Sequence, residues 1–189
     1  LGYSAGSALT TGVRNTILGG LAGDAITDAD FNVAVGTQAM STNTVGSRNV
    51  AVGRQALNAM NPASATDMFN TAVGDQAGGA VTTGAGSSLT DADNNVAFGY
   101  AALDADTLGS QSTALGWGSL STQNFTSATN SGNTAVGYRA GLAISTGTQN
   151  TILGGSAGDA LTDADFNVVV GESALSADTK GSQSVAIGV

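Results

Sequence analysis

The chain contains no cysteine, no histidine and a single proline among its 189 residues. The absence of cysteine excludes a disulfide framework and thiolate chemistry, and the absence of histidine removes the usual general base and the commonest zinc ligand. Charge is also scarce, because only 10% of the residues are charged and only five are basic, which leaves a net charge of −9. Nucleic-acid binding requires clustered Lys and Arg, so the composition argues strongly against a nucleic-acid partner and disfavours docking on anionic lipid.

Long apolar runs are missing as well. No stretch approaches the roughly 20 residues of a membrane-spanning helix, so we expect no membrane insertion in this segment. No signal peptide is visible, and both ends of the chain, Leu1 and Val189, lie inside a repeat. We interpret residues 1–189 as a single repeat array and expect it to be part of a longer fibre protein whose targeting signals lie elsewhere.

One five-residue phrase recurs through the whole chain: Asn or Ser, then Thr or Val, then Ala, Ile or Val, then a large apolar residue, then Gly. Its ten copies are NTILG at 15–19, NVAVG at 32–36, NVAVG at 49–53, NTAVG at 70–74, NVAFG at 95–99, STALG at 112–116, NTAVG at 133–137, NTILG at 150–154, NVVVG at 167–171 and SVAIG at 184–188. Counted from Gly2, the closing glycines are spaced by 17, 17, 17, 21, 25, 17, 21, 17, 17 and 17 residues. A period in this range is typical of stacked supersecondary units.

The repeat predicts an all-β fold, a parallel β-roll or β-solenoid of about ten stacked coils of 17–25 residues. Each phrase is expected to form a strand, and a weaker second strand of about five residues with tight turns would complete the coil. Glycine ends each strand where the chain must turn sharply, because glycine tolerates φ > 0 at little cost. The expected turn glycines are Gly19, Gly36, Gly53, Gly74, Gly99, Gly116, Gly137, Gly154, Gly171 and Gly188. The recurring Asn either stacks into a hydrogen-bonded amide ladder or simply suits a turn.

Alternation along the strand gives each phrase two faces. We expect the large apolar residue before the glycine to face the core. The predicted core is Leu18, Val35, Val52, Val73, Phe98, Leu115, Val136, Leu153, Val170 and Ile187. The alanine between the two core-facing residues would then point outward, on a face too small for an ordinary wet surface. We therefore expect this alanine face, or the small-residue row at Ala22, Ala39 and Ala56, to line a close contact between chains in a parallel homotrimer.

A longer duplication overlies the short period. Residues 2–53 recur at 137–188, and about two thirds of the positions are identical. Expansion of a repeat array by duplication produces this pattern.

The phrases SVAIG, NTAVGYRAG and NVAVG, each followed by a small residue three positions after the glycine, resemble the head repeats of trimeric autotransporter adhesins. They are also similar to the NTAVGY-type repeats of bacteriophage tail fibres. The resemblance covers the whole chain and implies a left-handed homotrimeric β-roll at an extracellular location, on a virion fibre or a bacterial cell surface. The coils are longer than typical adhesin repeats, and the basic neck and membrane anchor of the adhesins are missing from these residues, which favours the phage type.

On this basis we interpret the chain as a non-enzymatic structural segment of a bacteriophage tail fibre that holds a receptor-binding tip and contributes to host attachment. Its partners would be two further copies of itself and a host or matrix surface receptor. The alternative is the adhesive head of a bacterial surface adhesin, and a weaker third interpretation is a calcium-dependent secreted or surface repeat protein.

Acidic turns resemble the opening of a calcium loop: TDADFN at 27–32 and 162–167, and TDADNN at 90–95. An EF-hand also requires Gly at its sixth position and Glu at its twelfth, where this chain, counted from Asp28, has Val33 and Ala39. The EF-hand interpretation therefore fails. A looser calcium site between coils is a weak candidate, and solvated turn carboxylates are the simpler explanation. Its oxygen donors would be Asp28, Asp30, Asp163 and Asp165.

No catalytic residues and no other cofactor are predicted. Carboxylate pairs such as Asp104 with Asp106 fall in repeated turns, whereas a catalytic site is singular. Four aromatic residues each follow a closing glycine, at a corner that we expect to be partly exposed. They are Tyr3, Tyr100, Trp117 and Tyr138. Such rings either stack on a receptor glycan or only cover the outside of the turn.

Overall fold

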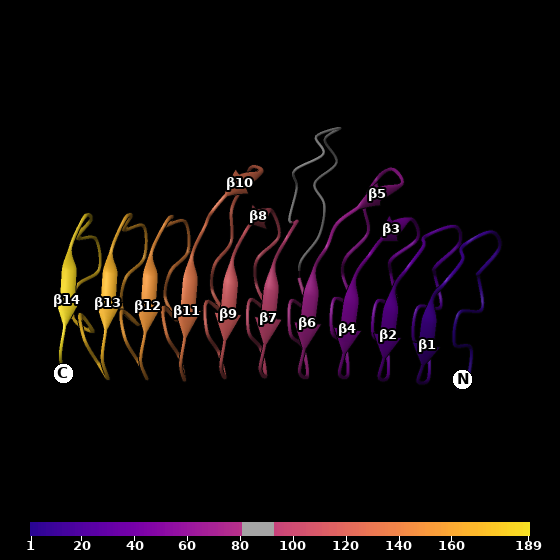
Figure 1. The fold of residues 1–189 in the computed structure, drawn as a ribbon, viewed down its shortest axis with the longest axis horizontal. Helices are drawn as coiled ribbons and strands as arrows, with labels where there is room; N and C mark the ends of the chain where they lie inside the picture. The colour runs from indigo at the N-terminus through magenta and orange to yellow at the C-terminus, as the bar shows by residue number, and fades with distance from the viewer. Residues whose placement is uncertain (81–92) are drawn as a thin grey trace.

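The computed structural model describes residues 1–80 and 93–189, and within them the chain is all-β (Figure 1). One parallel sheet runs along the roll, and its strands follow one another in chain order. Its ten described strands are β1 (Thr16–Leu18), β2 (Val33–Val35), β4 (Val50–Val52), β6 (Thr71–Val73), β7 (Val96–Phe98), β9 (Thr113–Leu115), β11 (Thr134–Val136), β12 (Thr151–Leu153), β13 (Val168–Val170) and β14 (Val185–Ile187). Each strand is the centre of one phrase, so the predicted parallel β-solenoid is confirmed.

Successive phrases pair residue for residue. Ala34 of β2 lies opposite Ala51 of β4, and Ala51 lies opposite Ala72 of β6, across coils of 17 and 21 residues. The same register is kept across the 25-residue coil, where Ala72 pairs with Ala97 of β7. In the two 21-residue coils, all of whose residues the structure describes, the extra residues are therefore accommodated away from the main sheet.

The side of the coil opposite the sheet differs from the prediction. Only two short pairings lie outside the main sheet among the described residues, β3 (Gly46–Ser47) with β5 (Thr66–Asp67) and β8 (Gly109–Ser110) with β10 (Thr129–Asn130). Elsewhere the expected second strand is replaced by tight turns, in which the second and fourth residues after the closing glycine have left-handed φ angles, such as Gln38 at 59° and Met40 at 51°. The part of the chain that the structure describes contains no helix, and so none long and apolar enough to cross a bilayer.

The closing glycines stack directly on one another. Gly19 has a φ of 139°, in a region that side-chain-bearing residues rarely adopt. A Cβ atom at Gly19 would lie 2.5 Å from the carbonyl oxygen of Gly36 in the next coil, which is far inside van der Waals contact. The same obstruction recurs at every closing glycine from Gly2 to Gly171. Both backbone conformation and space therefore require glycine here.

The two faces of the strand are the reverse of those predicted. Ala34, Ala51 and the equivalent strand alanines are buried inside the roll, whereas the large residues before the glycine point outward. The predicted core residues that are exposed are Leu18, Phe98, Leu115, Leu153 and Ile187, and those that are half-buried are Val35, Val52, Val73, Val136 and Val170. Because the strand alanines from Ala34 to Ala135 are at most 3% exposed and Ala22, Ala39 and Ala56 have no exposed surface, the expected contact between chains at either alanine row is also wrong.

The true core comes from the turns opposite the sheet. Its largest side chains occupy the fourth and seventh positions after a closing glycine, and among them Met40, Leu57, Leu103, Leu120 and Ile144 are fully buried. These side chains fill the thin space in front of the sheet, so the strand residue facing them must be small.

Where the inward-facing middle residue of a strand is larger than alanine, the fourth residue after the closing glycine of that coil is small. Ile152 of β12 replaces the usual alanine, and the fourth position of its coil is Gly141 instead of Leu or Met. A Cβ atom at Gly141 would lie 3.1 Å from the Cδ1 atoms of Ile152 and Ile144. In this coil the larger strand residue therefore fills space that a leucine or methionine of the turn occupies in other coils.

The recurring asparagines form a hydrogen-bonded ladder, the first of the two alternatives that the sequence left open. The Oδ1 atom of Asn32 accepts a hydrogen bond from the backbone N–H of Asn49 at 2.9 Å, and the Nδ2 atom of Asn32 donates to the carbonyl of Gly46. This pattern repeats along the roll, and the asparagines from Asn32 onward are almost entirely buried. At Ser112 the amide ladder is interrupted. The backbone N–H of Ser112 donates to Oδ1 of Asn95, but Ser112 has no side-chain amide to continue the pattern, and its hydroxyl lies against that of Ser131.

The adjacent glycines 154 and 155 provide a matched test of the stacking. Gly154→Ala should lower the free energy of unfolding by about 3 kcal/mol or more, because φ is 141° and the new Cβ would overlap the carbonyl of Gly171. Gly155→Ala should change it by less than about 1 kcal/mol, because a Cβ there meets nothing within 4 Å. Urea denaturation followed by circular dichroism measures both, and equal effects of the two substitutions would contradict the stacking argument.

Candidate functional site

The outer surface of the main sheet is a continuous apolar strip, which we call the sheet face. It consists of the first and third residues of the ten strands, namely Thr16, Leu18, Val33, Val35, Val50, Val52, Thr71, Val73, Val96, Phe98, Thr113, Leu115, Thr134, Val136, Thr151, Leu153, Val168, Val170, Val185 and Ile187. None of them is charged. The third residue is large in every strand, with exposed fractions of 53% at Phe98 and 47% at Leu153. A solvated sheet face normally carries polar residues, so this strip has the character of a contact surface.

A second row runs along the corner where the chain leaves the sheet. This corner row consists of the residue after each closing glycine: Tyr3, Gly20, Thr37, Arg54, Asp75, Tyr100, Trp117, Tyr138, Gly155 and Glu172. Three consecutive aromatic rings stack here, with ring centroids 5.9 Å apart for Tyr100 and Trp117 and 5.1 Å apart for Trp117 and Tyr138. All three side chains are about half exposed, so the predicted aromatic corner is a surface feature.

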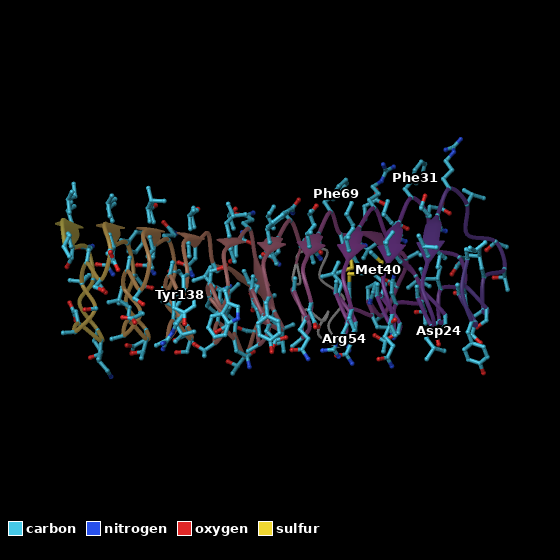
Figure 2. The ribbon with its side chains drawn as sticks, turned by 90° about the horizontal axis from the view of Figure 1, so that it is seen from below. Asp24, Phe31, Met40, Arg54, Phe69 and Tyr138 are labelled. Carbon is cyan, nitrogen blue, oxygen red and sulfur yellow. The ribbon has the colours of Figure 1, made fainter. Side chains whose placement is uncertain are left out.

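Figure 2 shows the strands along one edge of the roll, with Phe31 and Phe69 beyond them, and Tyr138 and Arg54 on the opposite side. Tyr3, the fourth predicted aromatic, lies in the first coil and is 82% exposed. Between it and the ring stack, the corner row holds an ion pair in which a guanidinium nitrogen of Arg54 lies 3.0 Å from a carboxylate oxygen of Asp75.

The residue before each phrase forms a third row, which the sequence analysis did not identify. The guanidinium of Arg48 lies 4.8 Å from the ring centroid of Phe31 and 5.8 Å from that of Phe69, and Arg14 covers the other side of Phe31 at 5.0 Å. Arg48 also pairs with Asp67 at 2.7 Å. Alternation of Arg and Phe at successive coils is the signal that would have predicted this cation–π ladder, which stabilises the stacking.

The structure does not bring the four candidate calcium ligands together. Asp28 and Asp30 lie in the coil that leads into β2, whereas Asp163 and Asp165 lie in the coil that leads into β13, near the opposite end of the roll (Figure 1). Asp30 and Asp165 instead accept hydrogen bonds from backbone N–H groups of the preceding coil, at 2.7 Å in each case. The described residues include no group of three or more acidic side chains arranged to hold a metal. Of the third acidic turn, Asp91 lies outside the described residues.

The most unusual titratable group is Asp106, which is fully buried in the middle of the roll. Its Oδ1 atom accepts a hydrogen bond from the backbone N–H of Gly109 at 2.9 Å, and its Oδ2 atom accepts one from Nε2 of Gln123 at 2.6 Å. Gln123 continues the network, since its Nε2 also donates to the hydroxyl of Ser112 and its Oε1 accepts from Asn133. Asp106 therefore belongs to a buried polar network rather than to an exposed carboxylate pair with Asp104.

Burial raises the pKa of Asp106 to about 6, because the interior disfavours the charged carboxylate more than its hydrogen bonds from Gln123, Gly109 and Leu108 favour it. The seventh position after the closing glycine alternates between apolar and polar residues, and Asp178 occupies it in a later coil. There the backbone N–H groups of Gly181 and Lys180 lower the pKa of the exposed carboxyl. One position in the coil thus produces opposite shifts according to burial.

The raised pKa of Asp106 predicts a pH-dependent stability. Relative to an unfolded value of 3.8, the folded chain retains a proton between about pH 4 and pH 6 that the unfolded chain has released. The free energy of unfolding should therefore fall as the pH rises through this window, by at most about 3 kcal/mol, and stay lower above pH 6.

Asp106→Asn should remove this component and be more stable than the unmodified chain at pH 7. Asn43 shows that the position accepts asparagine, because it accepts from the N–H of Gly46 and donates to the carbonyl of the same residue, each at 2.8 Å. Urea titrations at pH 4, 5, 6 and 7 give the stability difference between the two chains. Asp178→Asn is the control and should shift the profile in the opposite direction, whereas a difference for Asp106→Asn that does not vary with pH would contradict the assignment.

No protein-family model, no curated protein and no solved structure matches the chain. The functional proposal therefore depends on the surfaces and packing of this molecule.

Proposed function

We propose that the chain is a non-enzymatic structural segment of an elongated fibre, of the bacteriophage tail-fibre kind, and that it assembles as a parallel homotrimer through its sheet face. The observation that carries the proposal is the unbroken, uncharged sheet face, which runs across ten strands. Large apolar strips of this kind on a protein surface mark sites of association.

The repeat distance of the sheet face determines what kind of partner can pack against it. Its side chains repeat once per coil, at the strand spacing of about 4.8 Å. A partner that fills the spaces between them along the whole length must carry the same repeat, and a second copy of this chain carries it. Because the sheet face has no charge, identical copies can meet there without electrostatic repulsion.

A parallel arrangement with three chains suits the shape of this surface. A three-fold axis along the roll brings coils of equal height together, so each strand lies level with its equivalent strand in the two neighbouring chains. Each strand contributes two outward residues, which supplies one uncharged row for each of two neighbours: a row of threonine and valine at the first strand position and a row of large apolar residues at the third. Sharing this surface also compensates for the thin core of a single roll, in which the strand residues are mostly alanine.

The resulting object is a rod. Ten strands at about 4.8 Å per step extend for about 43 Å, and additional coils would lengthen the rod without changing its cross-section. Such a segment separates what lies at its two ends, as a fibre that holds a receptor-binding tip away from a particle requires.

Association through the sheet face predicts a mass of about 55 kDa for the 189-residue chain, three times its own 18.3 kDa, in size exclusion with light scattering. Leu115→Asp combined with Leu153→Asp should yield a folded species near 18.3 kDa, because both side chains are exposed in the single roll and lie two strands apart. Circular dichroism checks that the β-sheet signal is retained.

The matched control is Ala135→Asp on β11, the strand between the two substituted ones. Ala135 has no exposed surface, so an aspartate there should unfold the roll rather than merely dissociate it. A folded 18.3 kDa species from the unmodified chain would refute self-association, and a mass of about 37 kDa would replace the trimer by a dimer.

A further inference from the structure

The stack of aromatic rings in the corner row ends at Tyr138, because the next coil has glycine at the equivalent position. Tyr100, Trp117 and Tyr138 occupy three consecutive coils, the following coil has Gly155 at this position, and the coil after that has Glu172. One face of Tyr138 is covered by Trp117, and on the other side the neighbouring coil provides no side chain.

The space beside Tyr138 is open. A Cβ atom built on Gly155 would meet no heavy atom within 4 Å, in contrast to the closing glycines, where it would strike the next coil. The backbone is aligned with that of the neighbours, because Ser156 donates to the carbonyl of Tyr138 and Ser173 donates to the carbonyl of Gly155, both at 2.8 Å. The corner row therefore has a gap at Gly155, although the backbone there keeps the spacing of its neighbours. We call this gap, in which a side chain would lie between Tyr138 and Glu172, the vacant rung.

The vacant rung has room for one six-membered ring. Successive rungs are about 4.8 Å apart, so Tyr138 and Glu172 are separated by about 9.6 Å along the roll, with one rung vacant between them. A ring in the vacant rung would stack on Tyr138 at a separation like the 5.1 Å between the centroids of Trp117 and Tyr138.

A polar group borders the vacant rung on its far side. Glu172 is exposed, and its carboxylate makes no hydrogen bond or ion pair within the described residues. Its oxygens are thus available to an incoming molecule. A suitable ligand has a flat apolar face for the tyrosine and a rim of hydroxyl groups for the carboxylate.

We propose that Tyr138, Gly155 and Glu172 form a binding site for a neutral pyranose ring, with the ring stacked on Tyr138 in the vacant rung and its hydroxyls donating hydrogen bonds to the carboxylate of Glu172. Equatorial hydroxyls around a face of C–H groups match this arrangement best. The site lies on the side of the roll away from the strands (Figure 2), so it does not depend on association through the sheet face.

The duplicated coils contain a partial second copy. Tyr3 and Gly20 correspond to Tyr138 and Gly155, and Gly20 is equally open, with nothing within 4 Å of a built Cβ. Thr37 stands where the first site has Glu172, so this copy lacks the carboxylate. We expect weaker binding there, and the difference provides an internal comparison.

The chain carries its own reporter, because Trp117 is the single tryptophan and is stacked on the covered face of Tyr138. Titration of the intact chain with methyl β-D-glucopyranoside should change the Trp117 fluorescence with a dissociation constant of about millimolar, as expected for one sugar ring held by stacking and a few hydrogen bonds. p-Cresol, which has a ring without the hydroxyl rim, should bind at least tenfold more weakly.

Gly155→Tyr fills the vacant rung and should abolish the fluorescence response while leaving the fold intact, because the corner row already accommodates tyrosine at three other coils. Tyr138→Ala should weaken binding at least tenfold, and Glu172→Gln severalfold. Gly20→Tyr is the matched control: it places the same side chain in the duplicated coil, far from Trp117, and should leave the response unchanged.

Three results would overturn the proposal. The first is the absence of any sugar response up to 100-fold above the expected constant, and the second is an unchanged response in Gly155→Tyr. The third is equal or tighter binding of p-cresol, which would make the place a receptor for aromatic side chains instead of sugars. The masses measured by light scattering are independent of all three results, so failure here leaves the proposed assembly untouched.

Discussion

At each closing position the carbonyl of one coil lies where a Cβ atom of the preceding coil would be, so the coils reach strand spacing only when that residue is glycine. Gly19 illustrates both sides of the requirement, with a φ of 139° and a hypothetical Cβ 2.5 Å from the oxygen of Gly36. Because the obstruction is backbone against backbone, no rotamer change relieves it. Parallel pairing, the register of the strands and the straightness of the roll all follow from this contact.

Because the register is fixed, the residues at one position of successive coils line up in a row along the rod. A side chain meets its own equivalent at about 4.8 Å, so a position gains stability from residue types that associate with themselves or alternate with a complement. Amides do so in the Asn32–Asn49 ladder, rings in the stack that includes Trp117, and opposite charges at Arg54 and Asp75. The rows tolerate local exceptions, since a serine or a glycine in one coil removes one rung and leaves the backbone unchanged.

The period, the strands and the glycine turns could be predicted because they depend on contacts between identical positions, which the repeat itself displays. The direction of the two strand faces could not. Val52 is larger and more apolar than Ala51, and a rule based on hydrophobicity places Val52 inside, yet the side chain that fills the core beside Ala51 comes from a turn residue such as Leu57. The size of a buried residue is set by what faces it. The same limitation hid Asp106, whose burial follows from a turn position that is apolar in other coils.

The sheet face and the corner row differ in how freely their residues can change. Substitution on the sheet face acts on all chains of an assembly at once, so that face stays apolar from Leu18 to Ile187. The corner row faces away from the strands and is free to change from coil to coil, and it includes glycine, arginine, aspartate, glutamate and aromatic residues within one array. The two duplicated blocks, residues 2–53 and 137–188, share the pattern of the phrase but differ in the corner row, where one has Thr37 and the other has Glu172. A rod built in this way can change its corner row one coil at a time, because the glycine stacking and the asparagine ladder hold the coils together whichever residue occupies that row.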